Sequence, residues 1–304
     1  MQTSYLAHGK VILIGEHSVV YGYDALSMPI QSLNIKTTVS ENNNPCHYMD
    51  TDRYHGDFFK APSEYAGLKY ILQHFLTLKP NSPYLKISYR GLIPIERGLG
   101  SSATVSLGTT KALNDFFQLN LSEQEIMAIT NHAETINHGK ASGLDSATVN
   151  SDYLVFFNKK TGVEILKQKL NATLLIMDTG DLGNTKEAVE LVKNEVTNSP
   201  KQAENLTNLG NLTVQVKKAW LNQDAECVGN AFTQAQKYLA KLKVSTPKID
   251  HLCQIALDTG AYGTKLSGGG LGGIVIALCS NQELAQAIAN KSHKLISNYW
   301  IEEI

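Results

Sequence analysis

A short cluster of glycine and serine, Gly98-Leu99-Gly100-Ser101-Ser102, has the residue types that bind phosphate groups. Glycines give the backbone access to positive φ and allow a ligand to approach it closely. Ser101 or Ser102 could cap a following helix, whose first N–H groups and positive dipole end would face the cluster. These features predict a cradle for phosphate oxygens, and the Ser102 hydroxyl could reach a Mg²⁺ ion that bridges them.

The sequence on either side of the cluster decides between known phosphate loops. An apolar run from Leu85 to Ile93 indicates a strand before it, and apolar residues at helical spacing from Val105 to Phe117 indicate a helix after it. A Walker A loop is excluded because no Gly-Lys-Ser/Thr follows. The spacing Gly98-x-Gly100-x-x-Ala103 fits a dinucleotide fingerprint, but no second strand follows the helix. Taken alone, the stretch could also be a glycine turn before a serine-capped helix.

Other candidate residues lie far away in the sequence and are ambiguous one by one. Lys10 opens an apolar strand at 10–14, Glu16 and His17 follow that strand, and Asp145 lies in a tight loop framed by glycines and serines. Each of these is compatible with an ordinary surface or turn residue. Glu134 lies on a helix, away from its apolar stripe, which is typical of a solvated charge.

Two further patterns carry less weight. His132, Glu134 and His138 suggest a metal site, but the two histidines point to different faces and no Pro-Cys-x-x-Cys follows. The second glycine cluster, Gly268–Gly273, also fits a dinucleotide fingerprint, yet a strand follows it where a helix is required. So many glycines between two strands indicate a backbone that a ligand or another loop approaches closely.

The composition limits the class of protein. The 304 residues are 42% hydrophobic and 18% charged, which suits a globular protein with two domains. A net charge of −1 gives no electrostatic reason to expect nucleic acid or an anionic membrane as a partner. The four cysteines are widely spaced, and we find no signal peptide or spanning segment, so we expect reduced thiols in a cytoplasmic protein.

Hydrophobic periodicity gives the elements that must position these residues. Gly9, Gly15 and Gly22 divide the first motif into strand, turn and strand, and residues 47–59 suggest a loop or lid. A capping box at Ser122–Glu125 and an N-cap at Asn184 mark two helix starts. The expected strands are 10–14, 35–39, 85–93, 153–157, 163–166, 174–178, 274–279 and 299–301, and the expected helices are 63–76, 105–117, 123–138, 184–196, 202–240 (more than one), 247–257 and 283–292.

The second half of the chain therefore follows the order β-α(αα)-β-β-α-β, a split βαβ (ferredoxin-like) sandwich with extra helices. The fold class is α+β, with an N-terminal mixed α/β domain in residues 1–168 and a C-terminal domain in residues 169–304.

Three stretches taken together resemble the GHMP kinase superfamily: Gly9-Lys10 to Gly22, the Gly-Leu-Gly-Ser-Ser cluster, and Lys265 to Gly273. They occur in the family's order, and the resemblance covers essentially the whole chain. Gly15-Glu16-His17-Ser18-Val19-Val20-Tyr21-Gly22 is similar to the form in members that phosphorylate mevalonate. The resemblance implies the two-domain fold of that family, an active site in the cleft between the domains, and transfer of the ATP γ-phosphate to the C5 hydroxyl of mevalonate.

The resemblance also implies roles for single residues. Asp145, in Ser142-Gly143-Leu144-Asp145, matches the catalytic base, and Lys10 matches the lysine that contacts both this base and the reacting hydroxyl. Ser102 and Glu134 match the Mg²⁺ ligands, so the family pattern overrides the solvated-charge interpretation of Glu134. The ATP loop corresponds to Pro94, Ile95, Glu96, Arg97, Gly98, Leu99, Gly100, Ser101, Ser102 and Ala103, and the substrate-side residues correspond to Glu16, His17, Asn184, Thr185, Gly269 and Gly270.

The chain departs from the family pattern in two places. Glu96-Arg97 stand where many members have Gly-Ala, a form typical of bacterial-type members, and Ala141 replaces a frequent proline. The alternatives that stay open are another GHMP kinase, above all one acting on phosphomevalonate, and a ligand-binding regulator without turnover on the same fold. We expect a monomer or homodimer that takes ATP, Mg²⁺ and mevalonate and binds neither nucleic acid nor membrane.

Overall fold

The computed structural model describes residues 1–94, 97–139 and 142–304. The chain forms two compact units that are not consecutive in sequence: unit 1 consists of residues 1–10, 33–93 and 100–152, and unit 2 of residues 11–32, 94–99 and 153–304. The long strands β1 (Gln2–Ile14) and β2 (Ala25–Glu41) each contribute residues to both units. The expected division at 168/169 refers to the two family domains and stays a prediction.

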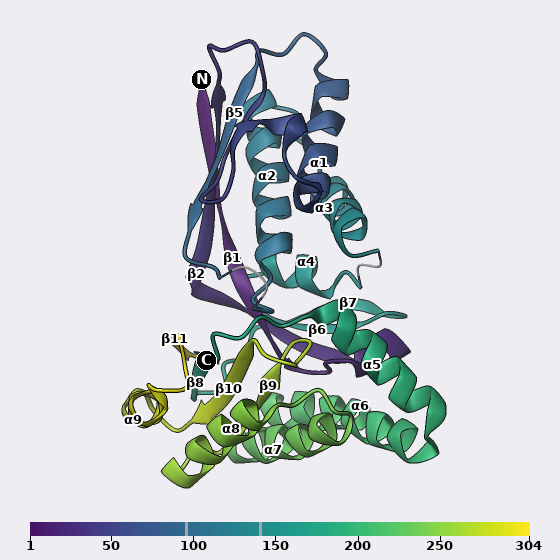
Figure 1. The fold of residues 1–304 in the computed structure, drawn as a ribbon, viewed down its shortest axis with the longest axis vertical. Coiled ribbons are helices and arrows are strands. Elements are labelled where there is room, and N and C mark those ends of the chain that lie inside the picture. The colour runs from purple at the N-terminus through teal and green to yellow at the C-terminus, as the bar shows by residue number, and fades with distance from the viewer. Residues whose placement is uncertain (95–96, 140–141) are drawn as a thin grey trace. The chain divides into compact units, whose positions relative to one another are not determined.

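Unit 1 is a sheet covered by helices. The strands follow the order β4-β3-β5-β2, with β1 paired to β2. Helices α1, α2 and α3 pack on one another and lie on one side of β1, β2 and β5 (Figure 1). The elements are β3 (Tyr48–Asp50), β4 (His55–Asp57), β5 (Leu85–Gly91), the 3₁₀ turns η2 (Phe58–Lys60) and η3 (Ser63–Tyr65), and helices α1 (Ala66–Leu78), α2 (Ser101–Phe117), α3 (Glu123–His138) and α4 (Leu144–Val149).

Helix α2 approaches the sheet very closely in this unit, because its middle carries a glycine. A Cβ added at Gly108 would lie 2.7 Å from Oγ1 of Thr37 on β2. Nearby, the hydroxyls of Tyr89 on β5 and Thr109 on α2 share a hydrogen bond of 2.9 Å. The Thr104 hydroxyl, in the first turn of α2, donates to the His8 carbonyl of β1 at 2.9 Å, so the N-terminus of α2 lies against β1.

Unit 2 contains the split βαβ sandwich that the sequence predicts. Its sheet has the order β11-β8-β10-β9 with antiparallel neighbours, and α7, α8 and α9 pack on it (Figure 1). Strands β8, β9 and β10 are buried along their whole length, which explains the apolar runs of β8 and β10. The elements are η1 (Ser18–Tyr21), β6 (Leu154–Asn158), β7 (Gly162–Leu166), β8 (Thr173–Asp178), α5 (Thr185–Asn198), α6 (Pro200–Leu221), α7 (Ala225–Lys241), α8 (Pro247–Thr259), β9 (Gly263–Ser267), β10 (Ile274–Cys279), α9 (Gln282–Ser292) and β11 (Asn298–Glu303).

Three local expectations are wrong. The first strand begins at Gln2, so Lys10 lies inside it. The second part of the first motif forms the 3₁₀ turn η1. The segment 47–59, expected to be a loop or lid, contains the hairpin β3–β4, whose strands of three residues are too short to show a two-residue period. Side-chain bonds support the hairpin: Arg90 donates to Asp50 at 2.8 Å and, as the main cause, lowers the pKa of Asp50 to about 2.

Other sequence expectations are confirmed. The Ser122 capping box begins α3, and the four cysteines are free thiols. Within the described part of the chain, no helix combines the length and apolar character that a membrane span requires.

Candidate active site

The glycine–serine cluster is divided between the units: Gly98 and Leu99 belong to unit 2, and Gly100 to Ser102 lead into α2 in unit 1. Gly98 and Gly100 adopt φ values of 83° and 77°, as predicted for a loop that must turn sharply. The expected serine cap is wrong: Gly100 is the N-cap, and Ser101 and Ser102 are the first residues of the helix. Because Gly100, in the left-handed conformation, occupies the N-cap position, the hydroxyls of Ser101 and Ser102 do not cap the helix and can bind other partners. Ala103 points into an apolar cluster behind the loop, and Ile95 and Glu96 lie outside the described residues.

Lys10 runs directly beneath this loop and reaches Asp145. A Cβ added at Gly100 would lie 2.7 Å from Cγ of Lys10, so only glycine leaves room for the lysine stem. The buried Nζ of Lys10 lies 2.9 Å from Oδ1 of Asp145. Asp145 is in the first turn of the short helix α4, not in a loop as expected, and its side chain is 44% exposed. Unit 1 therefore joins the glycine–serine start of α2, a buried cation and an accessible carboxylate.

Glu134 is buried on α3 and faces α2, which overturns the solvated-charge interpretation and agrees with the family pattern. Ser102 and Ser106 both donate to its Oε1, at 2.8 and 2.9 Å. Burial raises the pKa of Glu134, and the two serine hydrogen bonds and nearby His138 oppose that rise. A carboxylate and a hydroxyl at a helix N-terminus form an oxygen donor set that fits a hard cation such as Mg²⁺. Among the described residues, no three His, Cys, Asp or Glu side chains gather as a complete protein metal site.

In unit 2, Glu16 is paired with a lysine that the sequence analysis did not single out as a functional residue. Lys265 on β9 is fully buried and donates to Oε1 of Glu16 and, at 2.6 Å, to the carbonyl of Leu266. Burial lowers the pKa of Lys265, while the charge of Glu16 opposes this. The pair connects the first and third sequence motifs within the unit.

His17 is also buried in unit 2 and bonds to the third motif. Its Nε2 donates to the carbonyl oxygen of Gly269 at 2.9 Å, so Nδ1 is the unprotonated ring nitrogen. Nδ1 is buried and has no hydrogen-bond partner among the described residues. Burial, as the main cause, lowers the pKa of His17 to about 4. The backbone of His17 adopts φ 58°, an unusual value that the surrounding structure must hold in place.

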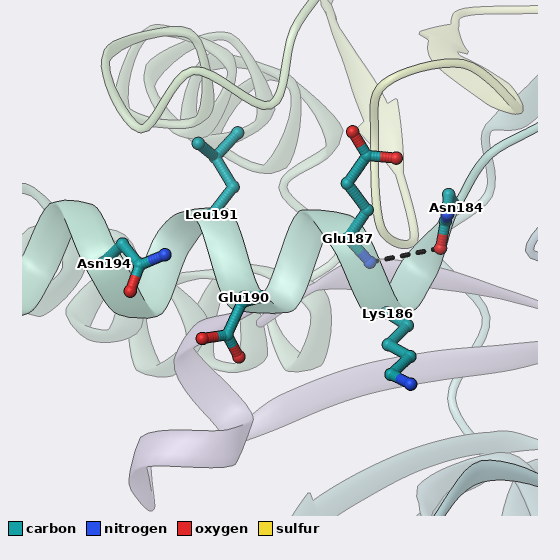
Figure 2. Close-up of a pocket in the computed structure, with 6 residues that line it drawn as sticks. All are labelled: Asn184, Lys186, Glu187, Glu190, Leu191 and Asn194. Atoms are coloured by element: carbon teal, nitrogen blue, oxygen red, sulfur yellow. Dashed lines mark hydrogen bonds between the residues drawn. The ribbon is translucent and has the colours of Figure 1, made fainter.

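The start of α5 lies against the same glycine loop. Asn184 caps α5 by accepting from the Glu187 N–H at 3.1 Å, as the sequence predicts, and a Cβ added at Gly269 would lie 3.0 Å from Cα of Thr185. Figure 2 shows a hollow along α5 next to this cap. Its volume is about 620 Å³, and it is lined by Asn184, Lys186, Glu187, Glu190, Leu191 and Asn194.

Arg97 and Gly98, which belong to the part of the ATP-loop stretch in unit 2, pack against the third motif. A Cβ at Gly98 would lie 3.7 Å from the Ser267 carbonyl oxygen, and a Cβ at Gly273 would lie 3.1 Å from the Arg97 carbonyl oxygen. Gly270 is also confined, since its Cβ would lie 2.3 Å from the Val244 carbonyl oxygen. The backbones of the loop and of the glycine cluster can pack this closely because the glycines have no side chains.

Sequence reasoning missed several residues of these clusters. Ser106 lies four residues after Ser102, so helical spacing alone places both on one face of α2. Lys265 lies in the short strand Gly-Thr-Lys-Leu-Ser, whose sequence gives no apolar pattern that would mark it as buried. The partner of Arg97, Asp178 at the end of β8, has no sequence signal that links the two.

Comparisons with known proteins show the family of the chain. The GHMP kinases N terminal domain model matches residues 65–151, and the GHMP kinases C terminal model matches residues 216–295. A mevalonate kinase of Pyrococcus horikoshii is 30% identical over 94% of this chain and 91% of its own, and one of Methanocaldococcus jannaschii is 32% identical over 90% and 91%. The crystal structure of the Methanococcus jannaschii mevalonate kinase matches with a TM-score of 0.86 and 25% identity, over 100% of this chain and 99% of that one.

The chain belongs to the GHMP kinase family. It is an ATP-dependent kinase with the two-domain mixed α/β fold of that family, and the relatives named above, which it matches over nearly their whole length, are mevalonate kinases.

Proposed function

We propose that the protein transfers the γ-phosphate of ATP to the C5 hydroxyl of mevalonate, giving ADP and 5-phosphomevalonate. The observation that carries this proposal is the cluster in unit 1, where the Lys10 stem passes under Gly100 and its Nζ lies 2.9 Å from Asp145. A phosphate cradle beside a carboxylate held by a buried ammonium group is what phosphoryl transfer to an alcohol requires. Similarity to mevalonate kinases supports the choice of acceptor.

In the proposed mechanism, Asp145 accepts the proton of the C5 hydroxyl while the hydroxyl oxygen bonds to the γ-phosphorus. The bond from that phosphorus to the oxygen bridging to the β-phosphate breaks, and ADP leaves with the electron pair. Lys10 orients Asp145 and stabilises the negative charge that develops on the attacking oxygen. The N–H groups at the start of α2 hold phosphate oxygens through the positive end of the helix dipole.

Ser102 and Glu134 would hold Mg²⁺, because their oxygens are the hard donors that this ion prefers and their site carries one carboxylate. The ion would neutralise charge on the phosphates. Ser106 fixes the Glu134 carboxylate from the next turn of α2. The roles of Glu16, His17, Asn184, Thr185, Gly269 and Gly270 on the substrate side rest on the family resemblance, as do cytoplasmic location and a monomer or homodimer.

The main competing function is phosphorylation of phosphomevalonate. That acceptor carries an additional phosphate and needs additional cations in its pocket.

The test is an assay of ADP release, coupled to NADH oxidation, with mevalonate, phosphomevalonate, galactose and homoserine as acceptors. We expect turnover with mevalonate of roughly 1–100 s⁻¹, the usual range for kinases. Faster turnover with phosphomevalonate would reject the proposed acceptor, and no turnover with any of the four would favour a ligand-binding regulator.

A further inference from the structure

The ATP loop belongs partly to each unit. Residues 94–99 are part of unit 2, whereas the residues on both sides, 33–93 and 100–152, are part of unit 1. The loop contains two glycines at positive φ, and glycine backbones are freer than others. Such a loop needs an external contact to hold its N–H groups in the orientation that a phosphate group requires.

Arg97 makes that contact within unit 2. Its Nε lies 3.4 Å from Oδ2 of Asp178, the last residue of β8, and the exposed fractions of the two side chains are 16% and 4%. Asp178 is itself fixed, because its Oδ1 accepts from the Gly180 N–H at 2.9 Å and its carbonyl accepts from the Ser297 N–H at 2.8 Å. The loop is therefore ion-paired with a carboxylate whose orientation is fixed by a second hydrogen bond.

The Arg97 backbone adds to the attachment, since its carbonyl oxygen lies close to Gly273 of the third motif.

We propose that Arg97 is a positioning residue for the nucleotide, which fixes the ATP loop through its ion pair with Asp178. The proposal rests on the proposed function in assigning this loop to ATP, although it holds for any acceptor. A loop that is already fixed pays a lower conformational cost when it binds phosphate. Loss of the ion pair therefore weakens the affinity for the nucleotide more than the affinity for the acceptor.

The test is calorimetric titration of MgADP and MgATP, without acceptor, into wild type, Arg97→Met, Asp178→Asn and the double variant. Asn keeps the shape of Asp178 and can still accept from the Gly180 N–H, so this variant preserves the strand end. Lys217→Met is the matched control, because it breaks another ion pair of unit 2, at 2.6 Å from Glu164. Thermal melting shows that each variant is folded.

We expect each single variant to weaken nucleotide binding by about 10- to 100-fold, the usual effect of a displaced binding group. The double variant should be no weaker than the worse single variant, because the two side chains act as a pair. Lys217→Met should bind as wild type does. In steady-state assays the KM for ATP should rise with the Kd, and the KM for mevalonate should change less than about twofold.

Other results overturn the proposal. If Arg97→Met weakens binding and Asp178→Asn does not, Arg97 contacts the phosphates directly. If neither single variant changes the affinity, or the wild type binds no nucleotide, the ion pair has no positioning role. Wild-type binding of ATP without turnover of mevalonate would reject the proposed acceptor, while the same titrations would still decide the role of Arg97.

Discussion

Acid should destabilise unit 2 through His17, by about 2 kcal/mol between pH 7 and pH 5. Burial lowers the pKa of His17 from 6.5 to about 4, and this outweighs the hydrogen bond to Gly269, which raises it. Near pH 5 the unfolded chain therefore binds a proton at this residue and the folded chain does not. Each unit by which the pH falls in this range lowers the free energy of unfolding by about 1.36 kcal/mol. The stability that depends on neutral His17 is therefore complete above about pH 6.5 and is lost as the pH falls towards 4.

Tryptophan fluorescence during urea unfolding measures this directly, because both tryptophans, Trp220 and Trp300, lie in the same unit as His17. His17→Gln is the informative variant, since the glutamine amide can donate to Gly269 and does not titrate. Between pH 7 and pH 5, wild type should lose about 2 kcal/mol more than this variant. His251→Gln, at an exposed histidine of the same unit, should behave as wild type. Equal losses in wild type and His17→Gln would refute the reasoning.

Two further predictions concern the metal site and the buried ion pair. Ser102→Ala and Glu134→Gln should raise the Mg²⁺ concentration needed for half-maximal activity more than the KM for mevalonate, because each removes a hard oxygen donor; a Mg²⁺ titration at saturating ATP checks this, and an unchanged requirement in Glu134→Gln would exclude it as a ligand. Lys265→Met should destabilise the protein by about 3–5 kcal/mol, since it removes the buried cation that faces the Glu16 carboxylate, and adding Glu16→Gln should recover most of the loss. Urea unfolding measures both, and wild-type stability of Lys265→Met would contradict the argument.

Sequence patterns predicted those elements that are determined by residues close together in the chain. The capping box at Ser122 and the Asn184 cap need only residues within one helical turn, and both are present. The order of strands and helices in the second half also follows from periodicity, and it gives the sheet order of a split βαβ fold.

Features with a distant cause could not be predicted from the residues themselves. Glu134 is buried because Ser102 and Ser106, on another helix, cover its carboxylate, and its position off the apolar stripe suggested the opposite. The family pattern corrected this, because it records the result of the tertiary contact. The same holds for the two compact units, which exchange segments because β1 and β2 are long enough to contribute to both.

The central claim is that the Lys10–Asp145 pair carries the chemical step, and a single-turnover experiment with Asp145→Asn tests it most directly. Mixed with mevalonate and limiting labelled ATP, the variant should transfer phosphate about 10²- to 10⁴-fold more slowly than wild type, the usual contribution of a general base. Its ATP affinity should be nearly unchanged, because the start of α2 is untouched, and adding Lys10→Met should slow transfer little further. A transfer rate near that of wild type in Asp145→Asn would contradict the claim.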